Sequence, residues 1–171
     1  MSNRIAQWLE DPEEDERLLG SSVALIEFAR SSSELHRDHP RRLVSEAVWF
    51  WTERGSPSRK YKIRYRTPSA LRLQATLGMT AASKHLAHEH VHQRQAVIEH
   101  LLEDGTDVRA ALQSAQACVV TREEHVRLER FKHLHGWVRY LEAGIAPLDL
   151  STGSEVDLLA LITADRIAWG H

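Results

Sequence analysis

The chain has 171 residues, of which 42% are hydrophobic, and a formal net charge of −2. This composition suffices for a hydrophobic core and excludes a wholly disordered chain. No apolar run approaches the roughly 18 residues of a membrane-spanning helix, and the acidic start lacks the layout of a signal peptide. We therefore expect a cytoplasmic protein with no membrane partner. The single cysteine, Cys118, excludes an internal disulfide and a thiolate zinc site.

We expect one domain spanning residues 1–171, and its N-terminal part, residues 1–58, is predicted to be helical. Asp11 is a helix cap, Pro12 suits the first helical position and acids follow in the first turn, so a helix should run to about Arg30. A second helix is expected from near Pro40 to Gly55, because glycine commonly ends a helix.

The central part, residues 59–145, opens on a basic segment within a stretch that has no acidic residue between Arg54 and His88. In residues 60–66, KYKIRYR, apolar residues alternate with cations, which predicts a strand with one apolar and one cationic face. The cationic face is a candidate nucleic-acid-binding surface, formed by Lys60, Lys62, Arg64 and Arg66. Pairing with the acidic N-terminus, or simple solvation, explains the same charges equally well.

The remaining elements follow from caps and periodicity. Residues 84–92, KHLAHEHVH, fit either a strand or the first turns of a long helix. Residues 117–120 are β-rich, and Thr121 with Glu124 forms a capping box that begins the next helix. In the C-terminal part, residues 146–171, a capping box of Ser154 and Asp157 predicts the last helix. Further short helices are expected over residues 67–78, 93–104 and 106–115.

Histidines are concentrated in one region, since eight of the 11 lie between His85 and His135. If residues 84–100 form one helix, several histidines share a face that is either solvated or a zinc-binding ridge. If residues 84–91 form a strand, the adjacent pair Glu89-His90 precedes a helix that carries His125 and Glu129 one turn apart. Residues at that spacing lie on one helix face and can hold a single ion.

In the strand interpretation the sequence resembles the His-Me finger nucleases, often called the HNH superfamily. Glu89-His90 and the segment VTREEHVRLE, residues 120–129, carry the resemblance. It implies two antiparallel strands followed by a helix, and so a predominantly helical α+β fold in which a small two-stranded ββα-metal-like element is embedded among several helices. It also implies a divalent ion (Mg²⁺, Mn²⁺ or Zn²⁺) bound by Glu89, His125 and Glu129, with His90 as the general base.

The implied activity is metal-dependent endonucleolytic hydrolysis of phosphodiester bonds, with nucleic acid, DNA in the first instance, as the partner. In the family an asparagine orients the catalytic imidazole, but Asn3 is the only asparagine in this chain. Gln113, Gln116 or a backbone carbonyl are the candidate replacements. One alternative function is a non-catalytic nucleic-acid-binding or protein-inhibiting module, phage-borne, with a degenerate nuclease-like fold. Another is an all-helical regulatory protein whose histidines decorate its surface. The oligomeric state is left open.

Overall fold

The computed structural model describes residues 11–53 and 63–169. In this part of the chain the helices are α1 (Pro12–Ser31), α2 (His39–Glu53), α3 (Pro68–Leu77), α4 (Met79–Ala82), α5 (Arg94–Leu102), α6 (Val108–Ser114), α7 (Arg122–Glu129), α8 (Val138–Glu142) and α9 (Leu158–Trp169). The strands are β1 (Tyr65–Arg66), β2 (Leu86–His90), β3 (Ala117–Thr121), β4 (Leu148–Asp149) and β5 (Ser154–Glu155). None of the helices described is both long enough and apolar enough to cross a membrane.

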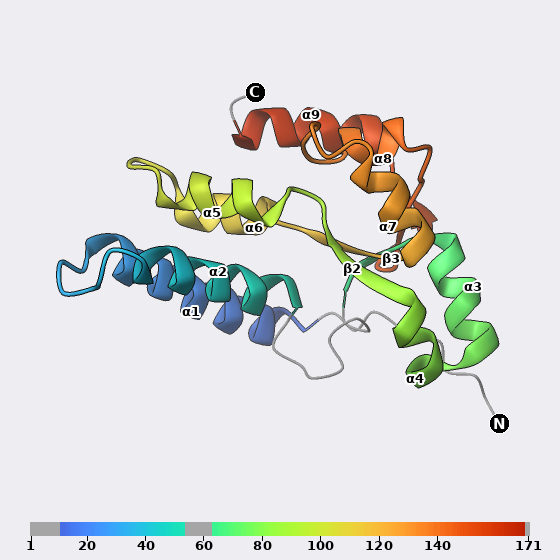
Figure 1. Ribbon diagram of the computed structural model, residues 1–171, viewed down its shortest axis with the longest axis horizontal. Coiled ribbons are helices and arrows are strands. Elements are labelled where there is room, and N and C mark those ends of the chain that lie inside the picture. The colour runs from blue at the N-terminus through green and yellow to red at the C-terminus, as the bar shows by residue number, and fades with distance from the viewer. Residues whose placement is uncertain (1–10, 54–62, 170–171) are drawn as a thin grey trace.

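A bundle of α1, α2, α5 and α6 forms one half of the molecule (Figure 1). Its core is apolar and includes Leu19, Ile26, Val44, Val48 and Leu101. The predicted start of the first helix is confirmed, because the Asp11 side chain accepts a hydrogen bond from the backbone N–H of Glu14 at 3.1 Å. Thr67 likewise caps α3 through the backbone N–H of Ala70. These caps satisfy N–H groups that the first turn of a helix leaves without a partner.

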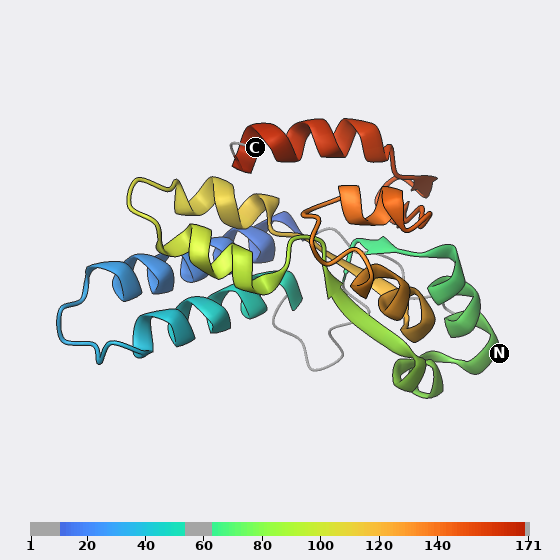
Figure 2. The same ribbon diagram turned by 45° about the horizontal axis from the view of Figure 1, so that its top comes forward.

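A mixed five-stranded sheet forms the other half, with the strand order β2-β3-β1-β4-β5. Strand β1 runs parallel to β3, whereas the remaining neighbours are antiparallel. One face of the sheet packs against α3 and α4, and the opposite face against α7, α8 and α9 (Figures 1 and 2). Because β2 lies at the edge, side chains from both of its faces can line one cavity around that edge.

Strands β2 and β3 carry the fold prediction on which the functional argument depends. They pair antiparallel, with Glu89 opposite Cys118, and α7 packs against both strands. Of the strand predicted over residues 84–91, residues 86–90 form β2. The alternative of one continuous helix from residue 84 is wrong. The chain between the two strands forms α5 and α6, so this pair is joined by two helices rather than by a tight turn.

The expected sheet was too small. The α+β class and the helical predominance are confirmed, but the structure has one five-stranded mixed sheet, whereas the sequence predicts a two-stranded element and a separate strand over residues 60–66. Strand β1 is the end of the strand predicted over residues 60–66, whereas β4 and β5 are each two residues long, too short to show an alternating pattern in sequence. Ser154 lies in β5 and does not cap the last helix, whereas the Asp157 side chain accepts from the backbone N–H of Ala160 at 3.0 Å.

Candidate metal centre on β2 and α7

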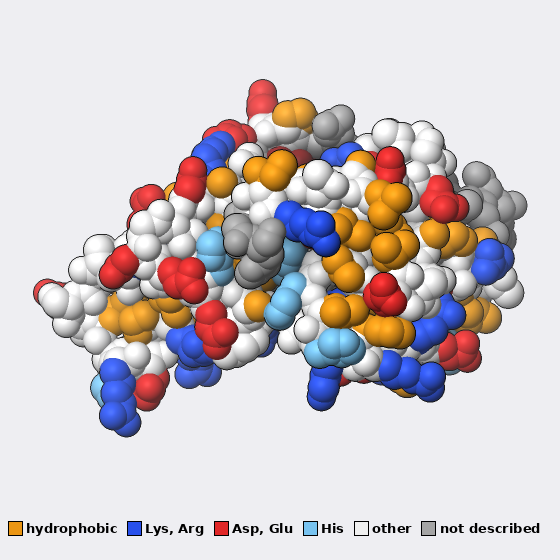
Figure 3. All heavy atoms as spheres, turned by 90° about the horizontal axis from the view of Figure 1, so that it is seen from above, with side chains coloured by type: hydrophobic (Ala, Val, Ile, Leu, Met, Phe, Trp, Pro, Cys, Tyr) orange, Lys and Arg blue, Asp and Glu red, His pale blue; other side chains and the backbone are white. Residues whose placement is uncertain are grey.

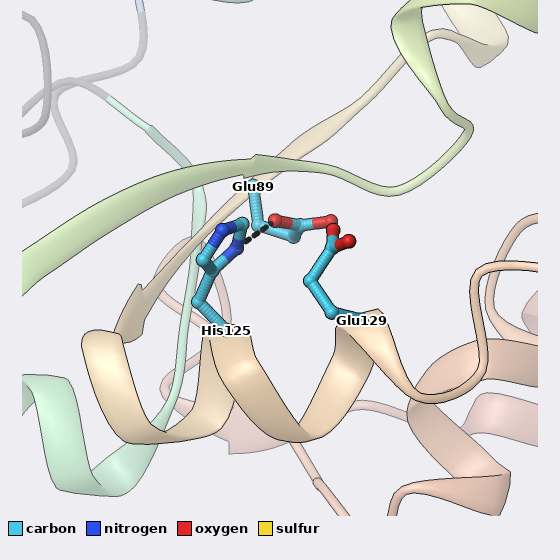
Figure 4. Close-up of side chains that lie close together, drawn as sticks. All are labelled: Glu89, His125 and Glu129. Carbon is cyan, nitrogen blue, oxygen red and sulfur yellow. Dashed lines mark hydrogen bonds and ion pairs between the residues drawn. The ribbon is translucent and has the colours of Figure 1, made fainter.

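Three potential metal ligands meet between β2 and α7 (Figure 4). One ligand atom from each of Glu89, His125 and Glu129 lies within 4.8 Å of the others. Glu89 projects from the face of β2 that α7 covers, while His125 and Glu129 are one turn apart on α7. The capping box of Thr121 and Glu124 begins α7 directly after β3, which places the helix across the strand pair.

Glu89 is buried and has two partners. The Nδ1 atom of His125 lies 2.6 Å from its Oε2, and the Nη2 of Arg139 donates to its Oε1 at 2.9 Å. The Arg139 side chain is only 1% exposed and also donates from Nη1 to the carbonyl oxygen of His90 at 3.3 Å. A buried carboxylate needs such partners, because desolvating an unpaired charge is costly. Arg139 therefore fixes the position of the deepest ligand.

The other two ligands are accessible from solvent. The His125 side chain is 39% exposed, and Glu129 is exposed at the last position of α7. Figure 4 shows the carboxyl groups of Glu89 and Glu129 turned toward one another. Arg139 contacts only Glu89 of these two acids, so a second negative charge remains at the mouth of the site.

A cavity of about 360 Å³ opens beside this cluster. It reaches around the free edge of β2, because Glu89 from one face of the strand and His88 and His90 from the other all line it. Arg94 and Lys132 also line it and bring positive charge. Seen from above, the molecule is notched between the helical bundle on the left and the sheet half on the right, and histidine side chains gather there (Figure 3).

His90 lines this cavity but is not a member of the metal-binding cluster. Its side chain lies on the face of β2 opposite Glu89 and packs toward α2, with its Nε2 3.1 Å from the Oγ1 of Thr52. The ring is 5.8 Å from Trp49 and 4.7 Å from His88, measured between centroids. Burial, with a smaller effect from the positive charge of Arg94, lowers the pKa of His90 to about 4, so the imidazole is neutral at neutral pH.

The structure corrects the predicted cationic face. Arg66 is fully buried and donates from Nη1 to the Oε1 of Gln74 at 2.9 Å, so it cannot meet nucleic acid at a surface. Arg64 lies outside β1 and makes a two-point ion pair with Asp149, at 2.8 and 2.6 Å. Tyr65 is buried against Trp137. Lys60 and Lys62, the other two residues of this prediction, lie outside the described residues.

Sequence reasoning missed Arg139 and Thr52, which hold the site in place. A signal existed for Arg139, since it lies among the apolar residues Trp137, Val138, Tyr140 and Leu141. A cation in such surroundings often marks a buried ion pair. Thr52 gave no signal, because a threonine near the end of a helix is common and its contact with His90 joins residues 38 positions apart.

Comparisons with protein-family models, with curated proteins and with solved structures find no match to this chain. The function is therefore inferred from the geometry of the site.

Proposed function

We propose that this chain hydrolyses phosphodiester bonds with the help of a divalent metal ion bound by Glu89, His125 and Glu129. The observation that carries the proposal is the convergence of two carboxylates and one imidazole within 4.8 Å of one another. Like charges this close repel each other, and Arg139 compensates only Glu89. A bound cation would remove the remaining repulsion. Carboxylate oxygens and imidazole nitrogen together suit Mn²⁺, Mg²⁺ or Zn²⁺.

The cavity supplies the other groups that such a reaction needs. The ion would act as a Lewis acid that stabilises negative charge developing on the phosphate and on the departing oxygen. His90 would accept a proton from the attacking water, because its imidazole is neutral and lines the same cavity as the metal cluster. Arg94 and Lys132 would attract the phosphate backbone, which favours nucleic acid as the substrate. We therefore assign phosphate binding to Arg94 and Lys132, and not to Arg64 and Arg66 of the predicted strand, which are paired or buried.

A second candidate is a non-catalytic binding or inhibitory module. The contacts of Glu89 favour it, because Arg139 and His125 already satisfy both carboxylate oxygens without any ion. On this interpretation Glu89, with Arg139 and His125, belongs to a partly buried polar network that joins α7 and α8 to β2. The two candidates differ in metal binding and in activity, so one set of variants separates them.

The experiment measures plasmid nicking by the purified chain with Mn²⁺ or Mg²⁺, together with metal affinity. We expect His90→Ala to lower the rate by about a hundredfold with metal affinity unchanged. His125→Ala and Glu129→Gln should lower both, and excess Mn²⁺ should partly restore the rate because only ligand binding is weakened. Glu123→Gln is the matched control, since it removes one charge from an exposed position of α7 outside the cluster. An inactive wild type without bound metal would favour the second candidate.

A further inference from the structure

Thr52 and His90 meet where the last turn of α2 packs against the edge strand β2. Thr52 is 7% exposed, and its Oγ1 lies 3.1 Å from the Nε2 of His90. One turn earlier on the same helix, Trp49 packs against the His90 ring with an angle of 35° between the two planes. The ring is thus held at one face by Trp49 and at one nitrogen by Thr52.

The hydrogen atoms in this contact can be assigned from the donors available. The Oγ1 of Thr52 is also 2.9 Å from the carbonyl oxygen of Val48, which can only accept. A hydroxyl has one hydrogen, and two oxygens at this distance are stable only if that hydrogen lies between them, on the bond from Oγ1 to the carbonyl of Val48. Both contacts are satisfied only if the Nε2 of His90 carries a hydrogen and donates to Oγ1. The reverse arrangement would leave two oxygens 2.9 Å apart with no hydrogen between them.

The assignment has a consequence for the cavity. A neutral imidazole carries one hydrogen, so a hydrogen on Nε2 leaves the lone pair on Nδ1. We propose that Thr52 is a positioning residue that fixes this tautomer of His90 and leaves Nδ1 as the nitrogen that accepts a proton at the site. The role of that proton transfer rests on the proposed function, whereas the tautomer itself does not.

Thr52 would then orient the His90 imidazole, the task for which the sequence offers Gln113, Gln116 or a backbone carbonyl in place of an asparagine. Gln113 and Gln116 line a second cavity, of about 280 Å³, which Thr52 also lines, so the contact with the His90 ring and not the cavity distinguishes Thr52 from them. Thr52 is the group of the described chain that contacts a His90 ring nitrogen, and it comes from a helix rather than from the segment between β2 and β3.

The test uses two variants of one side chain. Thr52→Val keeps the shape but removes the hydroxyl, whereas Thr52→Ser keeps the hydroxyl. Long-range ¹H–¹⁵N correlation spectra of histidine-labelled full chain at pH 8, where an ordinary histidine is neutral, report which ring nitrogen carries the hydrogen. The His90 signals are identified from their loss in His90→Gln. We expect the Nε2–H form in the wild type and in Thr52→Ser, and a mixture of tautomers in Thr52→Val.

The same variants are assayed for nicking. Thr52→Val should lower kcat about tenfold with KM and metal affinity unchanged, and Thr52→Ser should restore it. A wild-type His90 with its hydrogen on Nδ1, or identical His90 spectra in the wild type and Thr52→Val, would overturn the assignment. The expected spectra from a wild type that cleaves nothing would support the tautomer assignment and overturn the hydrolase proposal, so the two failures are distinguishable.

Discussion

Glu89 and Arg139 form a buried ion pair beneath the candidate site, with side-chain exposures of 8% and 1%. Such a pair contributes little net stability, because desolvation offsets much of the attraction between the charges. Removing either side chain alone, however, leaves an uncompensated charge in the protein interior, which is strongly destabilising. The pair also limits the negative charge of the cluster, because one of its two carboxylates is already compensated.

The first prediction concerns this pair. Arg139→Met should destabilise the fold by about 3 kcal/mol, because it leaves the Glu89 carboxylate buried without its cation. Adding Glu89→Leu to that variant should recover part of the loss, since both charges are then absent. Urea unfolding of the two single variants and the double variant measures the coupling. Additive losses would show that the two side chains do not act as a pair.

The second prediction concerns acid stability through Asp149. Burial alone would raise the pKa of Asp149, but hydrogen bonds from Arg64 and Ser151 lower it from 3.8 to about 2. A carboxylate with a depressed folded-state pKa stabilises the fold above its unfolded pKa, and this contribution disappears as the pH falls from about 4 toward 2. Because the partner Arg64 is partly exposed, we expect about 1 kcal/mol.

Asp149→Asn should therefore unfold with a weaker pH dependence between about pH 4 and 2 than the wild type. Urea unfolding at several pH values measures the difference. An equal pH dependence in the two proteins would mean that the contact between Arg64 and Asp149 does not persist in solution.

Sequence reasoning at the residue scale succeeded where spacing determines geometry. His125 and Glu129 are four positions apart on a helix with a clear cap, so a shared face followed directly. Glu89 was predicted to lie beside them because β3, the strand before that helix, pairs with β2, which carries Glu89. The burial of Arg66 could not be predicted in this way, since it depends on α3 covering one face of a sheet whose other short strands leave no sequence pattern.

At the element scale, one carboxylate ties together the first turns of two helices. The Oε2 of Glu124 accepts from the backbone N–H of Thr121 at 2.9 Å and from the Oγ1 of Thr67 at 2.6 Å. Thr121 and Thr67 are the caps of α7 and α3 respectively. Glu124 is 9% exposed, so these bonds are largely sheltered from water.

The third prediction follows from that arrangement. Glu124→Ala should destabilise the fold by about 2 kcal/mol, because one buried and one part-buried donor lose their acceptor. Glu123→Ala, at the preceding exposed position of the same helix, is the matched control and should change stability by less than about 0.5 kcal/mol. Thermal and urea unfolding measure both. Equal effects of the two substitutions would mean that helix propensity, and not the shared acceptor, governs this position.

The long elements could be predicted from sequence because their start signals are local. The caps at Asp11, Thr67 and Thr121 and the proline after the first two depend only on neighbouring residues. Strands β4 and β5 could not, because each is defined by its neighbour in the sheet and not by its own pattern. The parallel pairing of β1 with β3 joins residues more than 50 positions apart, which no local signal reveals.

For the whole molecule, α9 links the two halves. Ile162 of this helix packs in the core beside the sheet, while Trp169 packs in the core of the bundle and stacks on His92 at 4.2 Å between ring centroids. Asp165 pairs with the Nε2 of His92 at 3.1 Å. Gly136 lies against this pair with φ of +62°, where a Cβ atom would collide with both side chains.

The fourth prediction is that the two halves unfold together, as the expected single domain requires. Because α9 contributes side chains to both cores, unfolding of one half should remove packing from the other half and unfold it as well. Urea unfolding followed by tryptophan fluorescence and by far-ultraviolet circular dichroism should give coincident transitions. Trp169→Ala should weaken that coupling. Two separated transitions in the wild type would show that bundle and sheet are independent units.

The central claim is that Glu89, His125 and Glu129 bind a divalent ion, and titration of Mn²⁺ into the full chain tests it most directly. Isothermal calorimetry should show one saturable site in the wild type. Affinity should fall by about tenfold or more in His125→Ala and in Glu129→Gln, and stay unchanged in Glu123→Gln. The absence of saturable binding in the wild type, or the same affinity in all four proteins, would contradict the claim.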